Sequence, residues 1–248
     1  MSKRTDSNVY TIGFAVVMVL IVGSLLATVF SLTKPTITKN EEIEKQQNIL
    51  YAMGVNENDE SSANFVSTDV AGTEFAKYIK KQIVIQGDKI TEDGKAYLID
   101  VKKQQTYAKN GQERKLPLFI GEKDGKTFYI APIRGKGLWD AIWAYISMDE
   151  NMVVQGAYFD HKGETAGLGA NIKQRFFMDD FIGEHLLKAN GSFVGITVAK
   201  GNNDPKNEDK TDNEVDAIAG ATITGTGVSA MIKDELKLYI PYFKTLKK

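Results

Sequence analysis

The feature that most constrains this chain of 248 residues is an uncharged, apolar stretch near its N-terminus. Residues 10–33 contain no Asp, Glu, Lys or Arg and consist mainly of Val, Leu, Ile, Ala and Phe. As a helix, this stretch would be roughly 36 Å long at about 1.5 Å per residue, enough to cross a bilayer core of about 30 Å. We therefore predict a transmembrane helix at 10–33, after a short N-terminal tail at 1–9.

Two other interpretations of this stretch stay open. A secretory signal peptide fits the basic residues before it, although cleavable apolar regions run only about 7–15 residues and no A-x-A cleavage site lies near Lys34. A pilin-type helix fits Gly13-Phe14, although pilins carry a glutamate at the position of Met18. Basic residues lie on both sides of the stretch, so the positive-inside rule leaves its orientation undecided.

The composition excludes several classes of site. The chain has no cysteine, which rules out a disulfide framework, a thiolate-held iron–sulfur cluster, a Cys-ligated zinc and a cysteine nucleophile. With only two histidines, His161 and His185, a multi-histidine metal site is poorly supported. We therefore expect no metal site. A net charge of −1 gives no reason to expect nucleic acid. The chain also lacks a P-loop, a G-x-G-x-x-G and a G-x-S-x-G motif, so nucleotide-driven and triad chemistry are not expected.

Beyond the apolar stretch, the sequence predicts a linker and then one folded domain. Pro35 and residues 36–40 predict a short break, followed by an amphipathic helix from about Ile43 to Gly54. We assign 34–55 to this juxtamembrane helix and linker. The polar residues 56–64 predict a loop at the start of the domain, which we place at 56–248.

The domain alternates segments typical of strands with segments typical of helices. Apolar residues at helical spacing predict helices at Gln174–Lys188 and Thr226–Ile240, the second ending before Pro241. Because strands dominate the middle and helices the ends, the expected fold class is α+β. The β-branched and aromatic residues predict six strands, at Gln82–Gln86, Lys95–Val101, Thr127–Ile133, Trp139–Ser147, Met152–Asp160 and Phe193–Ala199.

Two loops rich in Gly and Thr are candidates for a binding site. They are His161–Asn171 and Asp216–Gly227, and both lie at the ends of predicted elements. Glycine allows close approach to the backbone, and N–H groups that lead into a helix bind phosphate well. The alternative is that Thr224 or Thr226 caps the last helix and the glycines serve turns.

The acidic loop 202–216 is a second candidate. Its six acids could form a calcium site, but their spacing fits no EF-hand. A solvent-exposed loop is the simpler interpretation.

The second of the Gly/Thr loops carries a specific motif. Residues 216–224 (DAIAGATIT) resemble the flavinylation motif D-G-x-S-G-A-T-x-T, in which a transferase esterifies the threonine after Gly-Ala to the phosphate of FMN. The resemblance implies that Thr222 is the covalent attachment point and that Asp216 belongs to the transferase recognition motif. The chain departs from the pattern at Ala217 and Ala219. The same motif implies cofactor contacts at Gly220, Ala221 and Thr224.

Two further segments share this resemblance. Residues 163–169 (GETAGLG) are similar to a G-E-T-P-G-L-G loop, with Ala166 where Pro is usual, and residues 135–139 (GKGLW) give a third match. Trp139 in a buried core and Glu164 as a loop cap are the alternatives for those two residues. The resemblance implies that the flavin is contacted by Trp139, Glu164, Thr165, Gly167 and Leu168.

With the apolar stretch, the chain resembles over its full length the C subunits of sodium-translocating NADH:quinone reductases, a family with an FMN-binding domain. The resemblance implies a flavoprotein that relays electrons through covalent FMN, with no residue acting as a catalytic acid, base or nucleophile. It also implies a bacterial inner-membrane location with the domain on the periplasmic side, and as partners the other subunits, a flavin transferase and the lipid bilayer. The related G subunits of Rnf complexes are the runner-up, and an anchored interaction domain without redox chemistry is the third alternative.

Overall fold

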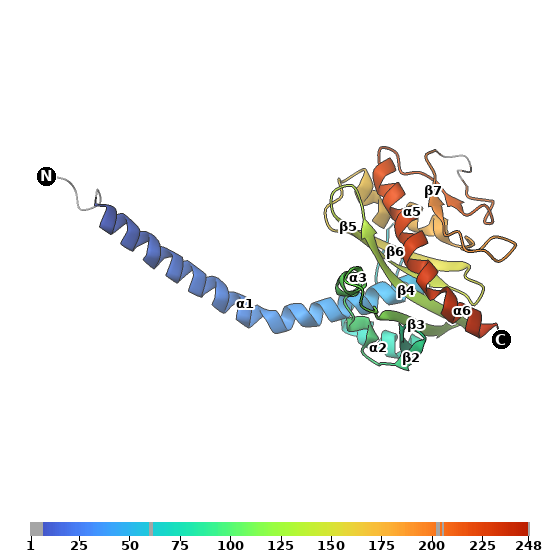
Figure 1. The fold of residues 1–248 in the computed structure, drawn as a ribbon, viewed down its shortest axis with the longest axis horizontal. Coiled ribbons are helices and arrows are strands. Elements are labelled where there is room, and N and C mark those ends of the chain that lie inside the picture. Colours follow the sequence, from blue (N-terminus) through green and yellow to red (C-terminus); the bar gives the residue numbers. More distant parts are fainter. Residues whose placement is uncertain (1–6, 60–61, 202–203, 205, 248) are drawn as a thin grey trace. The chain divides into compact units, whose positions relative to one another are not determined.

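The computed structural model describes residues 7–59, 62–201, 204 and 206–247, which fall into two compact units, 1–42 and 43–248. The first unit consists of most of helix α1 (Asn8–Ala52) (Figure 1). This helix is long and apolar enough to cross a membrane, with a mean hydropathy of 2.6 in its most apolar window and no residue of that window buried. Length and composition therefore make α1 a candidate membrane anchor.

The break expected at Pro35 is not present, because α1 continues through this residue. Proline removes one backbone N–H donor, but the remaining hydrogen bonds of a long helix are enough to continue it past a single lost bond. The expected end of the helix is confirmed. Residues 48–52 are buried in the second unit, and Gly54, at φ +74°, follows in the left-handed conformation that commonly ends a helix.

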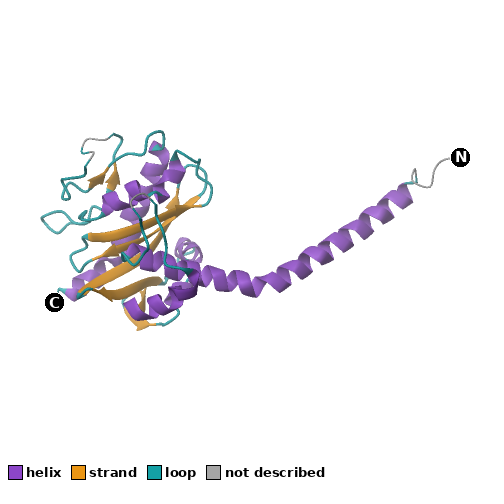
Figure 2. Ribbon diagram, turned by 180° about the vertical axis from the view of Figure 1, so that it is seen from behind, coloured by secondary structure: helices purple, strands orange, loops and turns teal. Residues whose placement is uncertain are grey.

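A six-stranded antiparallel sheet forms the centre of the second unit, in the order β2-β1-β3-β4-β5-β6 (Figures 1 and 2). Its alternating inward residues build most of the core. A separate pair of two-residue strands, β7 (Thr197–Val198) and β8 (Glu214–Val215), runs parallel. The large strands are β1 (Ile79–Gln86), β2 (Lys89–Glu92), β3 (Leu116–Lys123), β4 (Lys126–Lys136), β5 (Ala141–Met148) and β6 (Val154–His161).

Helix α5 (Thr222–Leu236) packs along β4 and lies across one face of the sheet (Figure 1). The approach is close: a Cβ added to Gly135 on β4 would come within 2.7 Å of Met231 Cβ on α5. α5 thereby fixes its own first residue beside the loops that follow β4 and β6. The other α-helices are α2 (Thr68–Tyr78), α3 (Val101–Lys109), α4 (Arg175–Met178) and α6 (Ile240–Leu246). Pro241, expected to follow the last helix, lies in the first turn of α6.

The α+β class is confirmed, and so are four of the six expected strands, those at β1, β4, β5 and β6. In β5, Ile142, Ala144 and Ile146 are buried while Trp143 and Tyr145 are half-buried, as alternation predicts. The strand expected at Lys95–Val101 is wrong. Asp100 accepts a hydrogen bond from the N–H of Lys103 and begins α3 instead.

The helix expected at Gln174–Lys188 is also wrong, because only α4 and a 3₁₀ turn at 179–181 form there. Phe177 and Phe181 turn onto Phe159 of β6, and the chain then pairs with the start of that strand through hydrogen bonds to Val154. The strand expected at Phe193–Ala199 is reduced to the two residues of β7, which pair with Glu214–Val215, while Phe193 forms an isolated bridge with Leu187.

Candidate functional site

Three segments far apart in sequence meet at the candidate site: the β4–β5 loop, the loop after β6, and the start of α5. They enclose a cavity of about 260 Å³. Two of the three are the Gly/Thr-rich loops singled out from the sequence, and the third carries the G-K-G-L-W segment. The cavity is lined by Leu138, Glu164, Thr165, Leu168, Gly169, Gly220, Ala221, Thr222, Ile223 and Thr224.

Glu164 joins the three segments. Its buried carboxylate accepts hydrogen bonds from the hydroxyl of Thr224 on α5, at 2.6 Å, and from the backbone N–H of Trp139, at 2.9 Å. Burial raises the pKa of Glu164, but these hydrogen bonds outweigh it and hold the pKa below its ordinary value. Glu164 is therefore an ionised group that fixes the loops to one another.

Glycines make room for this carboxylate. A Cβ at Gly137 would lie 2.5 Å from Glu164 Oε1, and a Cβ at Gly169 would lie 2.5 Å from both Glu164 Oε2 and the hydroxyl of Thr224. Gly220 has a φ of +70°, and a Cβ there would meet Leu168 at 2.8 Å. Glycine at these positions is required by space and, at Gly220, also by backbone conformation.

Thr222 is the first residue of α5, and its side chain is exposed. The N-cap residue, Ala221, provides no side-chain cap for the helix N-terminus. The interpretation that Thr224 or Thr226 caps this helix is wrong, since Thr224 donates to Glu164 and Thr226 donates to the carbonyl of Thr222. An exposed hydroxyl therefore lies at a helix N-terminus whose first N–H groups have no side-chain acceptor.

The rim of the cavity is apolar and exposed. Trp139 is not in the wall of the cavity, but its Nε1 donates to the hydroxyl of the lining residue Thr165 at 3.1 Å. It is 67% exposed, which excludes the core role considered for it. Leu138, Leu168 and Ile223 are also exposed. Large side chains left in solvent around one cavity are typical of a surface that another group covers.

Other residues expected in the site lie outside the cavity. Gly167 shapes the loop with a φ of +77° but is not in its wall. His161 accepts a hydrogen bond at Nδ1 from the backbone N–H of Glu164, so it is a local structural partner. Asp216 lies before the α5 turn, where burial and then the charge of Asp204 raise its pKa. Of the lining residues, Leu138, Gly169 and Ile223 were not expected as contacts, although each lies within a matched motif.

The acidic loop does not support the calcium interpretation. Among the described residues, no group of three or more His, Asp or Glu side chains is placed to hold a metal ion.

Comparison with known proteins gives consistent results. Residues 137–237 match the FMN-binding domain family, a range that contains all three segments of the site. The chain is 30% identical to the C subunit of the Na(+)-translocating NADH-quinone reductase of Haemophilus ducreyi, over 92% of this chain and 89% of the relative. It is 27% identical to the protein of the same name from Pseudomonas aeruginosa, over 92% and 90% of the two chains.

Solved structures agree with this result. The structure of the C subunit from Parabacteroides distasonis matches with 32% identity and a TM-score of 0.71, over 85% of this chain and 96% of that one. A second structure, NqrC of Shewanella oneidensis, is 24% identical with a TM-score of 0.66, over 84% and 98%, and supports the fold. The chain belongs to the family of C subunits of the Na(+)-translocating NADH-quinone reductase.

Proposed function

We propose that this chain carries an FMN esterified through its phosphate to Thr222 and that, as a subunit of the NADH-quinone reductase, it relays electrons within the complex. The observation that carries the proposal is the position of Thr222: an exposed hydroxyl on the first residue of α5, in the wall of the cavity. A helix N-terminus stabilises a phosphate through free N–H groups and the helix dipole.

The residues present fit FMN. The N-terminus of α5 suits the phosphate, and the exposed Leu138, Trp139, Leu168 and Ile223 suit a flat, largely apolar ring. The cavity of about 260 Å³ is smaller than the roughly 300–1,000 Å³ of ordinary ligand pockets, so it would cover only part of such a group. Contacts over so small a site give weak binding, and a covalent bond compensates for that.

The chain's own part in turnover is to hold and position the cofactor. FMN, when bound, supplies reversible redox chemistry, which no side chain of the protein provides. Thr222 provides the bonding oxygen, Gly220 leaves the backbone accessible beside it, and Glu164 keeps the three segments together. No residue acts as an acid, base or nucleophile in electron transfer.

The proposal extends to partners and location. The family makes the chain one subunit of a larger complex. We further propose that α1 crosses the bacterial inner membrane, that the domain lies on the periplasmic side, and that a flavin transferase loads Thr222. A protein of the Rnf type is disfavoured, because the matched relatives named above are C subunits of the quinone reductase.

The test is flavin fluorescence of the chain after denaturing electrophoresis, following co-expression with the transferase. Wild type is expected to fluoresce at its own mass, and its intact mass is expected to exceed that of the chain by one FMN adduct. Thr222→Ala is expected to lose both signals. Thr226→Ala, which alters an exposed threonine one turn along the same helix, is the matched control and is expected to keep both.

A fluorescent Thr222→Ala protein would show that the attachment site is wrong. A colourless wild-type chain, from a host with active transferase, would favour the interaction domain without redox chemistry.

A further inference from the structure

A second cavity of the domain, of about 560 Å³, shares no lining residue with the cavity at Thr222, although Trp139 in its wall borders the proposed flavin site. It lies between α3, the end of β4 and the far half of α5, and we call it the basic groove. We propose that the basic groove docks an acidic segment of another subunit of the complex. The inference goes beyond the proposed function and rests on membership of a complex with several subunits, not on the flavin. The residues that carry it are Lys109, Arg134, Lys136, Trp139 and Glu235.

The first step is the uncompensated charge of the groove. Lys109, Arg134 and Lys136 line it, and within the described part of the chain none of the three forms an ion pair. Helix α3 adds Lys102 and Lys103 and contains no acid. Three cations around one open cavity attract an anionic group and repel a basic one.

The second step is that the carboxylates in the wall are already paired. Glu235 accepts two hydrogen bonds from Arg114, at 2.5 and 3.1 Å, and a third from Gln105. Asp140 lies 2.9 Å from Lys162, whose hydrogen bond holds the pKa of Asp140 below its usual range. The charge of Arg134 also lowers the pKa of Asp140, but the lining holds four cations, with Arg114 included, against these two acids, so the groove keeps a net positive charge.

The third step is the rigidity of the groove. Gly135 of its wall lies where β4 packs on α5, facing Met231 without room for a methyl group. The half-buried bridge between Arg114 and Glu235 ties the residues before β3 to α5. Gln105 of α3 also donates to the carbonyl of Arg134 on β4, at 2.6 Å. A preformed groove binds a partner without a large ordering cost.

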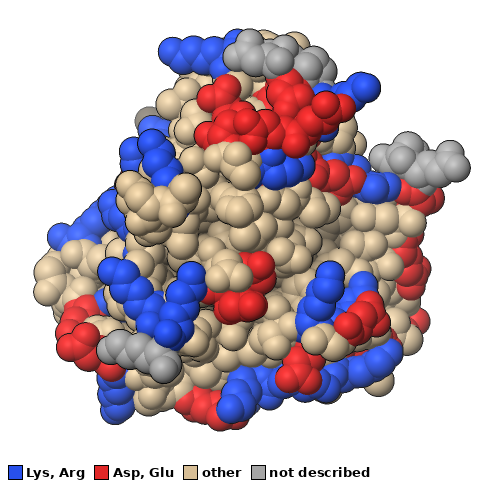
Figure 3. All heavy atoms as spheres, turned by 90° about the vertical axis from the view of Figure 1, so that its right-hand side faces the viewer, with Lys and Arg blue, Asp and Glu red and all other residues tan. Residues whose placement is uncertain are grey.

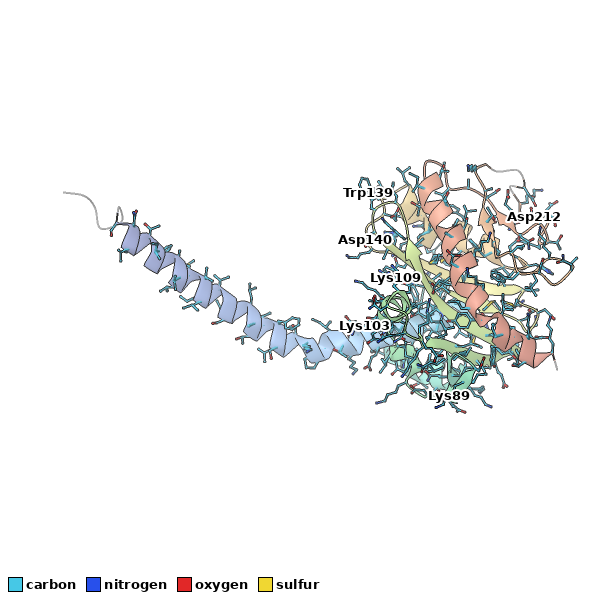
Figure 4. The ribbon with its side chains drawn as sticks, viewed as in Figure 1. Lys89, Lys103, Lys109, Trp139, Asp140 and Asp212 are labelled. Carbon is cyan, nitrogen blue, oxygen red and sulfur yellow. The ribbon has the colours of Figure 1, made fainter. Side chains whose placement is uncertain are left out.

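The fourth step is position. Trp139 lines one end of the groove and, through its bond to Thr165, also borders the candidate flavin site. In Figure 4, Trp139, Asp140 and Lys109 follow one another along one edge of the domain, while Asp212 of the acidic loop lies at the opposite edge. Figure 3, which shows the face on the side of Asp212, has a cluster of acidic atoms in its upper part. An acidic partner is thus attracted to the groove edge and repelled from the opposite edge.

An acidic protein segment is the occupant that fits these observations. Six of its eleven lining residues are charged, whereas small-molecule pockets have mostly apolar walls. A partner held in the groove would contact Trp139 and so lie beside the flavin site. Such a contact gives orientation and a fast encounter, both useful between redox subunits.

The experiment uses the full complex and a pair of matched charge-reversal variants. The groove variant is Lys109→Glu with Lys136→Glu, and the control is Lys89→Glu with Lys126→Glu, all four residues being exposed. The solubilised complex is washed with increasing NaCl, and the concentration that releases half of this protein is measured. Ion pairs are screened by salt, so we expect the groove variant to lower this concentration about two-fold or more and the control to leave it unchanged.

Carbodiimide cross-linking gives an independent measurement, because it joins a lysine to a carboxylate in contact with it. Lys109 or Lys136 is expected to link to an Asp or Glu of another subunit. The proposal is overturned if these lysines link only within their own chain while other links between subunits form. It is also overturned if both variants release at the wild-type salt concentration, or if the control falls as far as the groove variant.

Flavin fluorescence at Thr222 separates this inference from the proposed function. The groove variant is expected to keep its flavin fluorescence while it is released from the complex at a lower NaCl concentration. Loss of fluorescence in the groove variant would assign the lysines to flavin attachment and overturn the docking role. Absence of fluorescence in wild type would contradict the proposed function alone and leave the docking result intact.

Discussion

At the scale of single residues, the site depends on the carboxylate of Glu164. The sequence identifies this residue as part of the site but does not show which segments it joins. Glu164 was expected either to contact the flavin or to cap its loop. In the structure it lines the cavity and links Thr224, 60 residues away, to Trp139, 25 residues away. Thr222 could be predicted because its motif is local and contiguous. The role of Glu164 could not, because spacing along a chain does not reveal which loops meet in the fold.

A second buried carboxylate leads to a pH prediction. Glu184 is fully buried, neither of its oxygens has a hydrogen-bond partner, and Lys210 Nζ lies 3.8 Å away. Burial, with smaller contributions from the charges of Asp212 and Asp180, raises its pKa from 4.5 to about 7 against the opposing charge of Lys210. The folded state therefore binds a proton that the unfolded state has lost. This contribution to stability is full below about pH 4.5 and is lost as the pH rises through about 7.

The test compares the free energy of unfolding of wild type and Glu184→Gln between pH 4.5 and 8. One pKa unit corresponds to about 1.4 kcal/mol, so we expect Glu184 to lower the free energy of unfolding over this pH range by at most about 3.5 kcal/mol, and we expect this decrease to be absent in the variant. Glu208→Gln, at an exposed position in the same loop region, is the control and is expected to follow wild type. Equal slopes in wild type and Glu184→Gln would contradict this account of the buried carboxyl.

At the scale of elements, the sequence predicted strands with clear alternation and missed elements that tertiary packing decides. β5 alternates regularly and was found. The segment 95–101 is rich in residues favoured in strands, yet Asp100 as an N-cap makes it the entry to α3. The segment 174–188 has helical spacing, yet Phe177 and Phe181 contact Phe159 and the backbone pairs with β6. In both segments a specific local or long-range contact overrides the average propensity.

The contact between α5 and β4 gives a prediction at this scale. Alanine in place of glycine inside a helix ordinarily stabilises it by up to about 1 kcal/mol. At Gly227 the added Cβ would collide with the carbonyl oxygen of Lys136, a backbone atom of β4. We expect Gly227→Ala to lower the free energy of unfolding by about 2 kcal/mol, as overpacking does.

The matched control is Gly72→Ala in α2, where the nearest heavy atom to the added Cβ is 3.7 Å away. It is expected to be neutral or stabilising. Both variants are compared with wild type by denaturant unfolding. If Gly227→Ala were as stable as Gly72→Ala, the close packing of α5 on β4 would be refuted.

At the scale of the whole molecule, the boundary between the two units lies inside α1. The first unit ends at Glu42, whereas Ile49, Leu50 and Met53 are buried in the core of the second unit. The sequence placed its domain boundary at 55/56, because the helical spacing of 43–53 was interpreted as a linker. The last turns of α1 thus belong to the packed domain.

Truncation tests this boundary. A chain that begins at Ile43 keeps every residue of the core and is expected to unfold cooperatively. A chain that begins at Gly54 loses several fully buried side chains, each worth about 1.5–3 kcal/mol of burial, and is expected not to fold. Circular dichroism and denaturant titration distinguish the two. Cooperative unfolding of the shorter chain would show that the end of α1 is dispensable.

The position of Thr222 has a mechanical consequence. Because the residue begins a long helix packed along the sheet, its Cα is as immobile as the domain itself. A group bonded to its side-chain oxygen could rotate only about the few single bonds that join it to the backbone. Bringing that group closer to a distant electron donor would then require the whole domain to move. Movement of the domain, rather than of a loop, would therefore set the tunnelling distance.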